Sequence, residues 1–329
     1  MGWLRRPSPL QRRFMAMGTF VTVTVMTEPR GRVAADAAIS AIEREIDDFG
    51  RDAWAWGQGA LAQFNRRVAA GERVAVPLEL RPLFRRAWQI HEHSGGLFEP
   101  RIGALVRLWG FDDIARLRAE PPTTAQIDAL LAALRAAPAY DGGEHYGPAP
   151  DTAWDFGGIG KGYIVDCMLE RLQSRGYANV SIDAGGNLAV RGRRNERAWR
   201  IGIRDPRNPD APRLLATMDA CDEAVITHGD DQRYFEHRGT RYAHLLDPRS
   251  GWPCRGLRSL TVVHADAAFA DAAGGALFVA GAAGWRALAA RLGVSQALAL
   301  TDDGELLATP ALAPRLRAQP GVRIRAIAR

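Results

Sequence analysis

Segments with the period of a β-strand and segments with the period of a helix occur together in this chain of 329 residues, without strict alternation and without separating into two halves. Residues 19–26 alternate valine with threonine, as a half-buried strand does. Residues 32–49, 77–93 and 124–136 instead place apolar side chains at helical spacing. A parallel α/β sheet would require regular alternation, so this mixture predicts an α+β fold with mainly antiparallel sheets packed with helices.

Glycines set the expected ends of the first helices. We expect the first helix to end at Gly50 and the second at Gly95 and Gly96. The Gly, Pro and Ala content of residues 138–150 indicates a loop or an insertion. The remaining predicted elements are strands over 180–191, 199–203, 224–227 and 258–264, helices over 160–175, 265–279 and 285–292, and a terminal hairpin over 297–308. We expect one domain over residues 17–329, preceded by an N-terminal extension over residues 1–16.

Composition excludes several classes of protein. The chain is 47% hydrophobic and 24% charged, which is typical of a globular protein and excludes a disordered one. Its net charge is +6, but arginines are interspersed with acidic residues, so no basic tract indicates nucleic acid as a partner. Its three cysteines are too widely spaced for a disulfide framework or a CxxC metal site.

The apolar segments are also too short for a membrane span. No stretch approaches the roughly 20 apolar residues that a spanning helix needs. The N-terminal sequence MGWLRRPSPLQRRF carries positive charge but is not followed by the apolar run of a signal peptide. We therefore expect no membrane span and, for the chain as given, a cytoplasmic location.

The segment DFGGIGKGYIVD, residues 155–166, has the character of a phosphate site. Its glycines allow a ligand to approach the backbone closely, and they open a predicted helix whose N-terminal amides favour an anion. Lys161 adds a cation. The pattern matches neither the GxGxxG fingerprint nor the P-loop, so a glycine-rich helix entry with a surface lysine is the alternative interpretation.

Two further segments combine glycine with polar residues. In SIDAGGNLAV, residues 181–190, the paired glycines indicate a bulge in a strand or a ligand against the backbone, while Asn187 fits either a turn or a site. In RYAHLLDPRSG, residues 241–251, His244 is either a buried turn residue or a catalyst.

An acidic residue also interrupts an otherwise small and apolar helix. Asp271 lies in HADAAFADAAGGALFVAG, residues 264–281, where burial of an unpaired carboxylate would be costly. Its side chain must therefore reach solvent or meet a cation. A hard divalent metal bound through oxygen ligands fits this position.

Together these segments resemble the ApbE family of FAD:protein FMN transferases. The resemblance extends to MGTFVTVTV at 17–25 and SGGLFEPRIGALVRLWGF at 94–111, and continues through WRIGIRDP, RYAHLLDPRSGWP and SLTVVHADAAFADAAGGALFVAG in the family's order. It implies an ApbE-like flavin transferase domain with a T-fold-like architecture. The implied reaction is Mg²⁺-dependent transfer of the FMN half of FAD to a Thr or Ser hydroxyl of a client protein, with release of AMP.

The resemblance also assigns residues. It places the flavin, or FAD as a whole, against Met17, Leu97, Phe98, Glu99, Asp155, Lys161 and Leu245. The family's metal is held by a main-chain carbonyl that corresponds to Gly158, by Asp271, and at the position of Gly275. His244 corresponds to the base for the client hydroxyl, for which an ordinary pKa near 6.5 would be suitable.

The chain departs from the family pattern near the implied metal. Gly275 replaces a threonine ligand and Gly274 replaces a serine, while His228 stands in Thr-His-Gly where the family has Thr-Ser-Gly. Glu99 replaces an Asp or Asn. We expect weaker metal affinity, with water filling the missing position. The alternatives are an FAD pyrophosphatase that yields FMN and AMP, and a non-catalytic FAD-binding protein with a degraded metal site.

Overall fold

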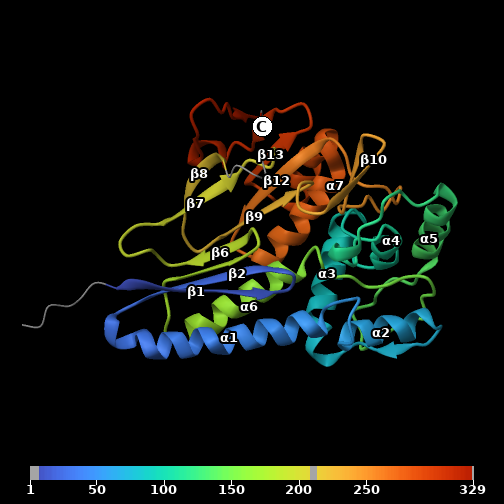
Figure 1. Ribbon diagram of the computed structural model, residues 1–329, viewed down its shortest axis with the longest axis horizontal. Helices are drawn as coiled ribbons and strands as arrows, with labels where there is room; N and C mark the ends of the chain where they lie inside the picture. Colours follow the sequence, from blue (N-terminus) through green and yellow to red (C-terminus); the bar gives the residue numbers. More distant parts are fainter. Residues whose placement is uncertain (1–6, 208–212, 328–329) are drawn as a thin grey trace, which may run out of the picture.

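A nine-stranded sheet forms the centre of the computed structural model, which describes residues 7–207 and 213–327 (Figure 1). Its strands in spatial order are β1 (Ser8–Ala16), β2 (Thr19–Thr27), β5 (Val180–Ala184), β6 (Asn187–Arg191), β9 (Ala224–Gly229), β12 (Leu257–His264), β13 (Ala297–Thr301), β14 (Leu306–Ala308) and β16 (Arg325–Ala326). Neighbouring strands are antiparallel except β14 and β16, which are parallel. The predicted α+β class with mainly antiparallel sheet is therefore confirmed.

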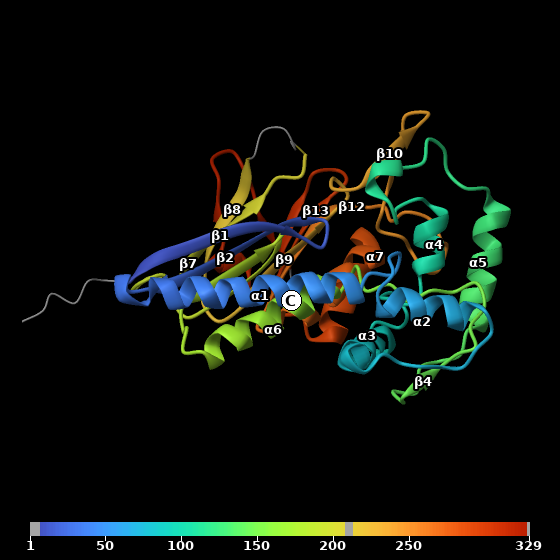
Figure 2. The ribbon, with the colours of Figure 1, turned by 60° about the horizontal axis from the view of Figure 1, so that its bottom comes forward.

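Three long helices pack against this sheet: α1 (Arg32–Asp52), α6 (Gly160–Ser174) and α7 (Ala267–Leu292). Figures 1 and 2 show α1 and α6 running beneath β1 and β2, with α7 continuing toward the other end of the molecule. The valines of β2 and the isoleucines of α1 are fully buried in the same core cluster. The alternation read from the sequence thus identifies the helix-facing side of β2.

A second sheet belongs to a separate core cluster. It consists of β7 (Trp199–Arg204), β8 (Leu214–Ala220) and β15 (Arg317–Ala318). Trp199 and Met218 pack with Val190 and Leu298 of the large sheet in that cluster. The large sheet is therefore covered on both faces, by helices on one side and by the small sheet on the other.

The remaining elements form a helical lobe at one end of the sheet (Figure 2). They are α2 (Ala60–Ala69), α3 (Arg81–His93), α4 (Gly103–Leu108), α5 (Thr124–Ala136), the strand pair β3 (Val74–Ala75) and β4 (His145–Tyr146), and the hairpin of β10 (Tyr234–His237) and β11 (Thr240–Ala243). Short 3₁₀ turns occur at Pro29–Gly31, Leu78–Leu80, Ile114–Arg116 and Ala313–Arg315. Helix α5 has the predicted bounds and begins with a capping box between Thr123 and Gln126.

The structure differs from three expectations about the fold. Helix α1 continues through Gly50, because the missing side chain makes room for Met17: a Cβ at Gly50 would lie 3.1 Å from the Met17 Cγ. Residues 8–16, expected in an extension, form strand β1. Gly185 and Gly186 make the turn between β5 and β6 rather than a bulge, with φ of 63° and 94°.

Helix α7 is broken at Gly281, where φ is 69° and ψ is −177°. The two helices predicted over 265–279 and 285–292 correspond to the segments on either side of this residue. Within the described part of the chain, α7 is the one helix long and apolar enough to cross a membrane, but 61% of its most apolar window is buried inside the protein. It is a core helix by this measure.

Candidate active site

The site is built where the N-terminus of α6 packs against α7. The Gly162 N–H donates a hydrogen bond of 3.0 Å to Oδ2 of Asp271, whose side chain is 1% exposed. A side chain at Gly162 would overlap the carbonyl oxygen of Ala267, so the close approach of the two helices requires glycine. Of the two alternatives left open by the sequence, the structure therefore excludes an Asp271 side chain that reaches solvent, and α6 holds one of its oxygens.

The other oxygen of Asp271 faces His228, a residue of β9. The distance from His228 Nε2 to Asp271 Oδ1 is 3.7 Å, and Nε2 is buried with no hydrogen-bond partner among the described residues. Burial lowers the pKa of His228, an effect that Asp271 opposes and Lys161 reinforces. The imidazole is therefore neutral at neutral pH. Gly275 lies beside the same ring, and a Cβ there would be 3.8 Å from His228 Cε1.

Lys161 links this pair to the glycine-rich loop. Its Nζ donates to the Gly157 carbonyl oxygen at 3.3 Å, and its charge acts on both His228 and His244. Asp155 accepts from the Gly157 N–H at 3.0 Å. Burial raises the pKa of the Asp155 carboxyl, while that hydrogen bond and the charge of Lys161 lower it.

His244 follows β11 and is held in one tautomer. Its Nδ1 lies 3.3 Å from the Arg233 carbonyl oxygen, and since a carbonyl only accepts, Nδ1 carries the proton and Nε2 keeps its lone pair. Burial, with the charges of Arg233 and Lys161, lowers the pKa of His244 to about 3. The ordinary pKa near 6.5 that we expected for this residue is therefore wrong in this environment.

Arg233 is a site residue that the sequence did not reveal. Its charge acts on both His244 and Asp155. A Cβ at Gly18 would lie 3.6 Å from Arg233 Nη2, which places the turn between β1 and β2 beside it. Met17, in that turn, has the uncommon φ of 50° for a residue with a side chain. Arg233 thus lies between the Met17 turn and His244, and no motif marked it.

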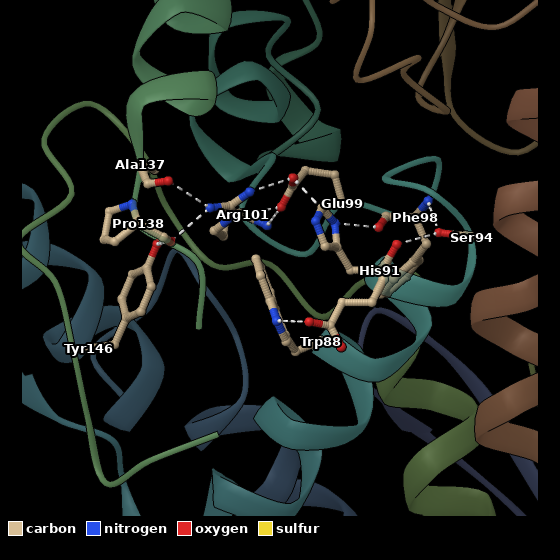
Figure 3. A network of polar contacts seen from close by, with 10 residues as sticks. Trp88, His91, Ser94, Phe98, Glu99, Arg101, Ala137, Pro138 and Tyr146 are labelled. Carbon is tan, nitrogen blue, oxygen red and sulfur yellow. Dashed lines mark hydrogen bonds and ion pairs between the residues drawn. The ribbon is translucent and has the colours of Figure 1, made fainter. Parts of the chain in front are cut away.

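Phe98 is fixed by a loop that borders the same glycines (Figure 3). Its N–H donates to Ser94 Oγ at 3.0 Å, and its carbonyl oxygen accepts from His91 Nδ1 at 3.0 Å. A Cβ at Gly158 would lie 3.3 Å from the Phe98 ring, so these two predicted site residues are neighbours. Leu97 precedes Phe98 and is half-buried.

Glu99 forms a buried ion pair that the sequence did not reveal. Both of its oxygens accept from the Arg101 guanidinium at 2.8 Å, in an ion pair that is almost fully buried (Figure 3). Arg101 also donates to the carbonyl oxygens of Ala137 and Pro138. The Glu99 carboxylate therefore anchors its loop. A contact between the flavin and the other atoms of Glu99 stays a prediction.

Leu245 and the position of the implied metal are the remaining predicted features of the site. Leu245 is half-buried beside His244, and its carbonyl oxygen accepts from the Cys254 N–H at 2.8 Å. Within residues 7–207 and 213–327, no group of three or more His, Cys, Asp and Glu side chains could hold a metal ion. A cation beside Asp271 would therefore depend on main-chain oxygens, water or the substrate for its remaining ligands.

Comparisons with known proteins identify relatives of this chain by sequence and by fold. A model of the ApbE family matches residues 17–299. The chain is 33% identical over 325 residues to an FAD:protein FMN transferase of Rhodobacter capsulatus, covering 97% of this chain and 60% of that relative's length. It is 28% identical over 273 residues to an FAD:protein FMN transferase of Vibrio cholerae, covering 80% of this chain and 79% of the relative. The crystal structure of the ApbE protein of Thermotoga maritima matches with a TM-score of 0.84 at 26% identity, covering 94% of this chain and 100% of that one.

Proposed function

The chain belongs to the ApbE family, and from this premise we propose that it transfers the FMN half of FAD to a hydroxyl side chain of a client protein, releasing AMP. The observation that carries the proposal is the cluster of Asp155, Lys161, His244 and Asp271 around the N-terminus of α6. A helix N-terminus with a nearby lysine suits a pyrophosphate, and a neutral imidazole suits a hydroxyl.

For the flavin half of FAD, we propose a position beside residues around this terminus. Met17 supplies the turn next to Arg233, and Phe98 with Leu97 borders Gly158. Leu245 adjoins His244 along the chain. This arrangement supports a flavin held between the β1–β2 turn and the Phe98 loop, with its phosphate end directed at α6.

His244 is the proposed base because of its tautomer. Its Nε2 lone pair can accept the proton of a Thr or Ser hydroxyl while Nδ1–H stays on the Arg233 carbonyl. The hydroxyl oxygen then forms a bond to the FMN-side phosphorus, and the bond from that phosphorus to the bridging oxygen breaks. AMP leaves with the bonding electron pair. The anionic pyrophosphate raises the pKa of His244 from its low value toward the reaction pH.

The residues around Asp271 fit a divalent cation. Its Oδ2 accepts from the Gly162 N–H, while its Oδ1 faces His228 Nε2, which has no hydrogen-bond partner among the described residues. We propose Asp271 and the main-chain oxygen of Gly158 as residues that hold the cation, Mg²⁺ by the family resemblance. When bound, it would offset the charge of the pyrophosphate.

The test is to incubate the protein with FAD and Mg²⁺ and with one of two acceptor peptides that differ by a single Thr→Val substitution. Release of AMP together with an FMN-sized mass gain on the Thr peptide alone supports transfer. AMP with free FMN and no peptide adduct would instead favour the pyrophosphatase alternative. Binding of FAD without AMP at any Mg²⁺ concentration would favour a non-catalytic binding protein.

A further inference from the structure

His228 occupies the space in which side chains at positions 274 and 275 would lie. A Cβ at Gly274 would be 2.7 Å from His228 Cδ2 and 2.8 Å from Nε2, closer than real side chains approach. The corresponding distance from Gly275 to Cε1 is 3.8 Å, an ordinary contact. Gly274 and His228 are therefore coupled, because the imidazole in this position leaves no room for a side chain at position 274, whereas Gly275 only borders the ring.

The same ring leaves a buried polar atom unsatisfied. His228 Nε2 has no hydrogen-bond partner among the described residues, and its 3.7 Å separation from Asp271 Oδ1 is too long for a hydrogen bond. An unpaired buried polar atom costs free energy, so such atoms are retained where a ligand satisfies them. Nitrogen and oxygen ligands each lie about 2 Å from a cation such as Zn²⁺, so two ligands of one cation are at most about 4 Å apart. The observed separation of 3.7 Å lies within this upper limit.

We propose that His228 Nε2 and Asp271 Oδ1 together form a nitrogen–oxygen ligand pair that replaces the hydroxyl missing at Gly275 and directs the site toward Mn²⁺ and related transition metals over Mg²⁺. Imidazole suits the divalent transition metals, whereas Mg²⁺ selects oxygen ligands. This inference about the metal ligands rests on the proposed function in one respect: that function identifies the anion that completes the coordination of the metal.

Two side chains alone make a weak site. Because the described residues contain no third His, Cys, Asp or Glu ligand in the group, the remaining positions go to main-chain, water or phosphate oxygens. The metal and a nucleotide diphosphate should therefore each strengthen the binding of the other. ADP is a suitable probe because it carries a pyrophosphate without a flavin.

The experiment is a titration of the protein with Mn²⁺ in the presence and absence of ADP, followed by electron paramagnetic resonance. Pulsed measurements should show ¹⁴N coupling from a histidine ligand in the wild type. Mg²⁺ should displace Mn²⁺ less readily from the wild type than from the triple variant H228S/G274S/G275T, by roughly tenfold or more. The triple variant restores the hydroxyls and removes the ring that would clash with a side chain at position 274.

The control is His237→Gln, which changes a histidine of the β10–β11 hairpin and should retain the ¹⁴N coupling. Absence of ¹⁴N coupling in wild-type protein with bound Mn²⁺ would overturn the proposal without requiring that any variant fold. Equal Mn²⁺ to Mg²⁺ preference in the wild type and a folded triple variant would also overturn it. Metal binding is read here without catalysis, so ¹⁴N coupling in a protein that transfers no FMN would reject the proposed function and keep this inference.

Discussion

The loop that carries Phe98 and the cluster at the start of α6 both contain buried polar groups. They differ in whether those groups have hydrogen-bond or ion-pair partners among the described residues. In the loop, Glu99 is fully paired with Arg101. In the cluster, His228 Nε2 has no partner among the described residues, and His244 keeps a free lone pair. A satisfied buried network supports a structure, whereas unsatisfied atoms are available to a ligand. The comparison separates the scaffold of the site from its reacting groups.

The largest expected effect is a loss of transfer rate when His244, a proposed reacting group, is replaced. His244→Ala should lower the rate of FMN transfer by roughly 10²–10⁴, because the acceptor hydroxyl loses its base. FAD affinity, measured by flavin fluorescence, should change little. His237→Ala is the matched control and should transfer at the wild-type rate. Loss of FAD binding together with transfer would show that His244 is structural and would remove the contrast with Glu99.

A substitution in the scaffold, here the loop that carries Phe98, should change the free energy of unfolding rather than the catalytic step. Glu99→Ala leaves the buried Arg101 guanidinium without its carboxylate, which should lower the free energy of unfolding by about 3–5 kcal/mol in urea titrations. Glu305→Ala breaks an exposed pair with Arg325 and should cost less than about 1 kcal/mol. Similar losses in the two variants would contradict the view that Glu99 anchors the loop.

A substitution at the junction of α6 and α7 should have a smaller effect on stability. Gly162→Ala should lower the unfolding free energy by about 1–3 kcal/mol, because the added methyl group overlaps the Ala267 carbonyl. Gly160→Ala, in the same turn of α6, meets atoms no closer than 3.7 Å and should be tolerated. Thermal unfolding of the two variants compares them directly. Equal stability would mean that the contact at Gly162 relaxes freely.

The smallest effect is a pH dependence. The pKa of folded His244 is about 3, below the unfolded value of about 6.5, so the unfolded chain binds this proton first as pH falls. Its stabilising contribution is present above pH 6.5 and is lost as pH falls toward 3. The stability difference between wild type and His244→Gln should therefore shift by about 1.6 kcal/mol against the wild type between pH 6.5 and pH 5. A pH-independent difference would indicate an ordinary histidine.

The sequence predicted elements whose evidence is local. The valine–threonine alternation of β2 and the Thr123 cap of α5 depend on neighbours in the chain, and both were confirmed. Gly50 was misread because its reason is a distant one: it accommodates Met17 across the core. A glycine that ends a helix and a glycine that admits a side chain look alike in a sequence.

The site shows the same limit. Asp271 was identified as a carboxylate with few polar neighbours, and the structure buries it. The coupling of His228 to Gly274 joins positions on different elements, so it required the packing of β9 against α7. The pairing of Glu99 with Arg101 and the position of Arg233 beside His244 likewise depend on side-chain geometry.

The most direct test of the distinction between scaffold and reacting groups is ¹⁵N NMR of histidine-labelled protein at pH 7, before and after addition of FAD. We predict that free His244 is neutral with its proton on Nδ1, and that its Nε2 signal shifts when FAD binds, while His91 of α3, which contacts the Phe98 carbonyl, keeps its tautomer. Assignments follow from His244→Ala and His91→Gln. A charged His244 in the free protein, or an Nε2 signal that does not respond to bound FAD, would contradict the account.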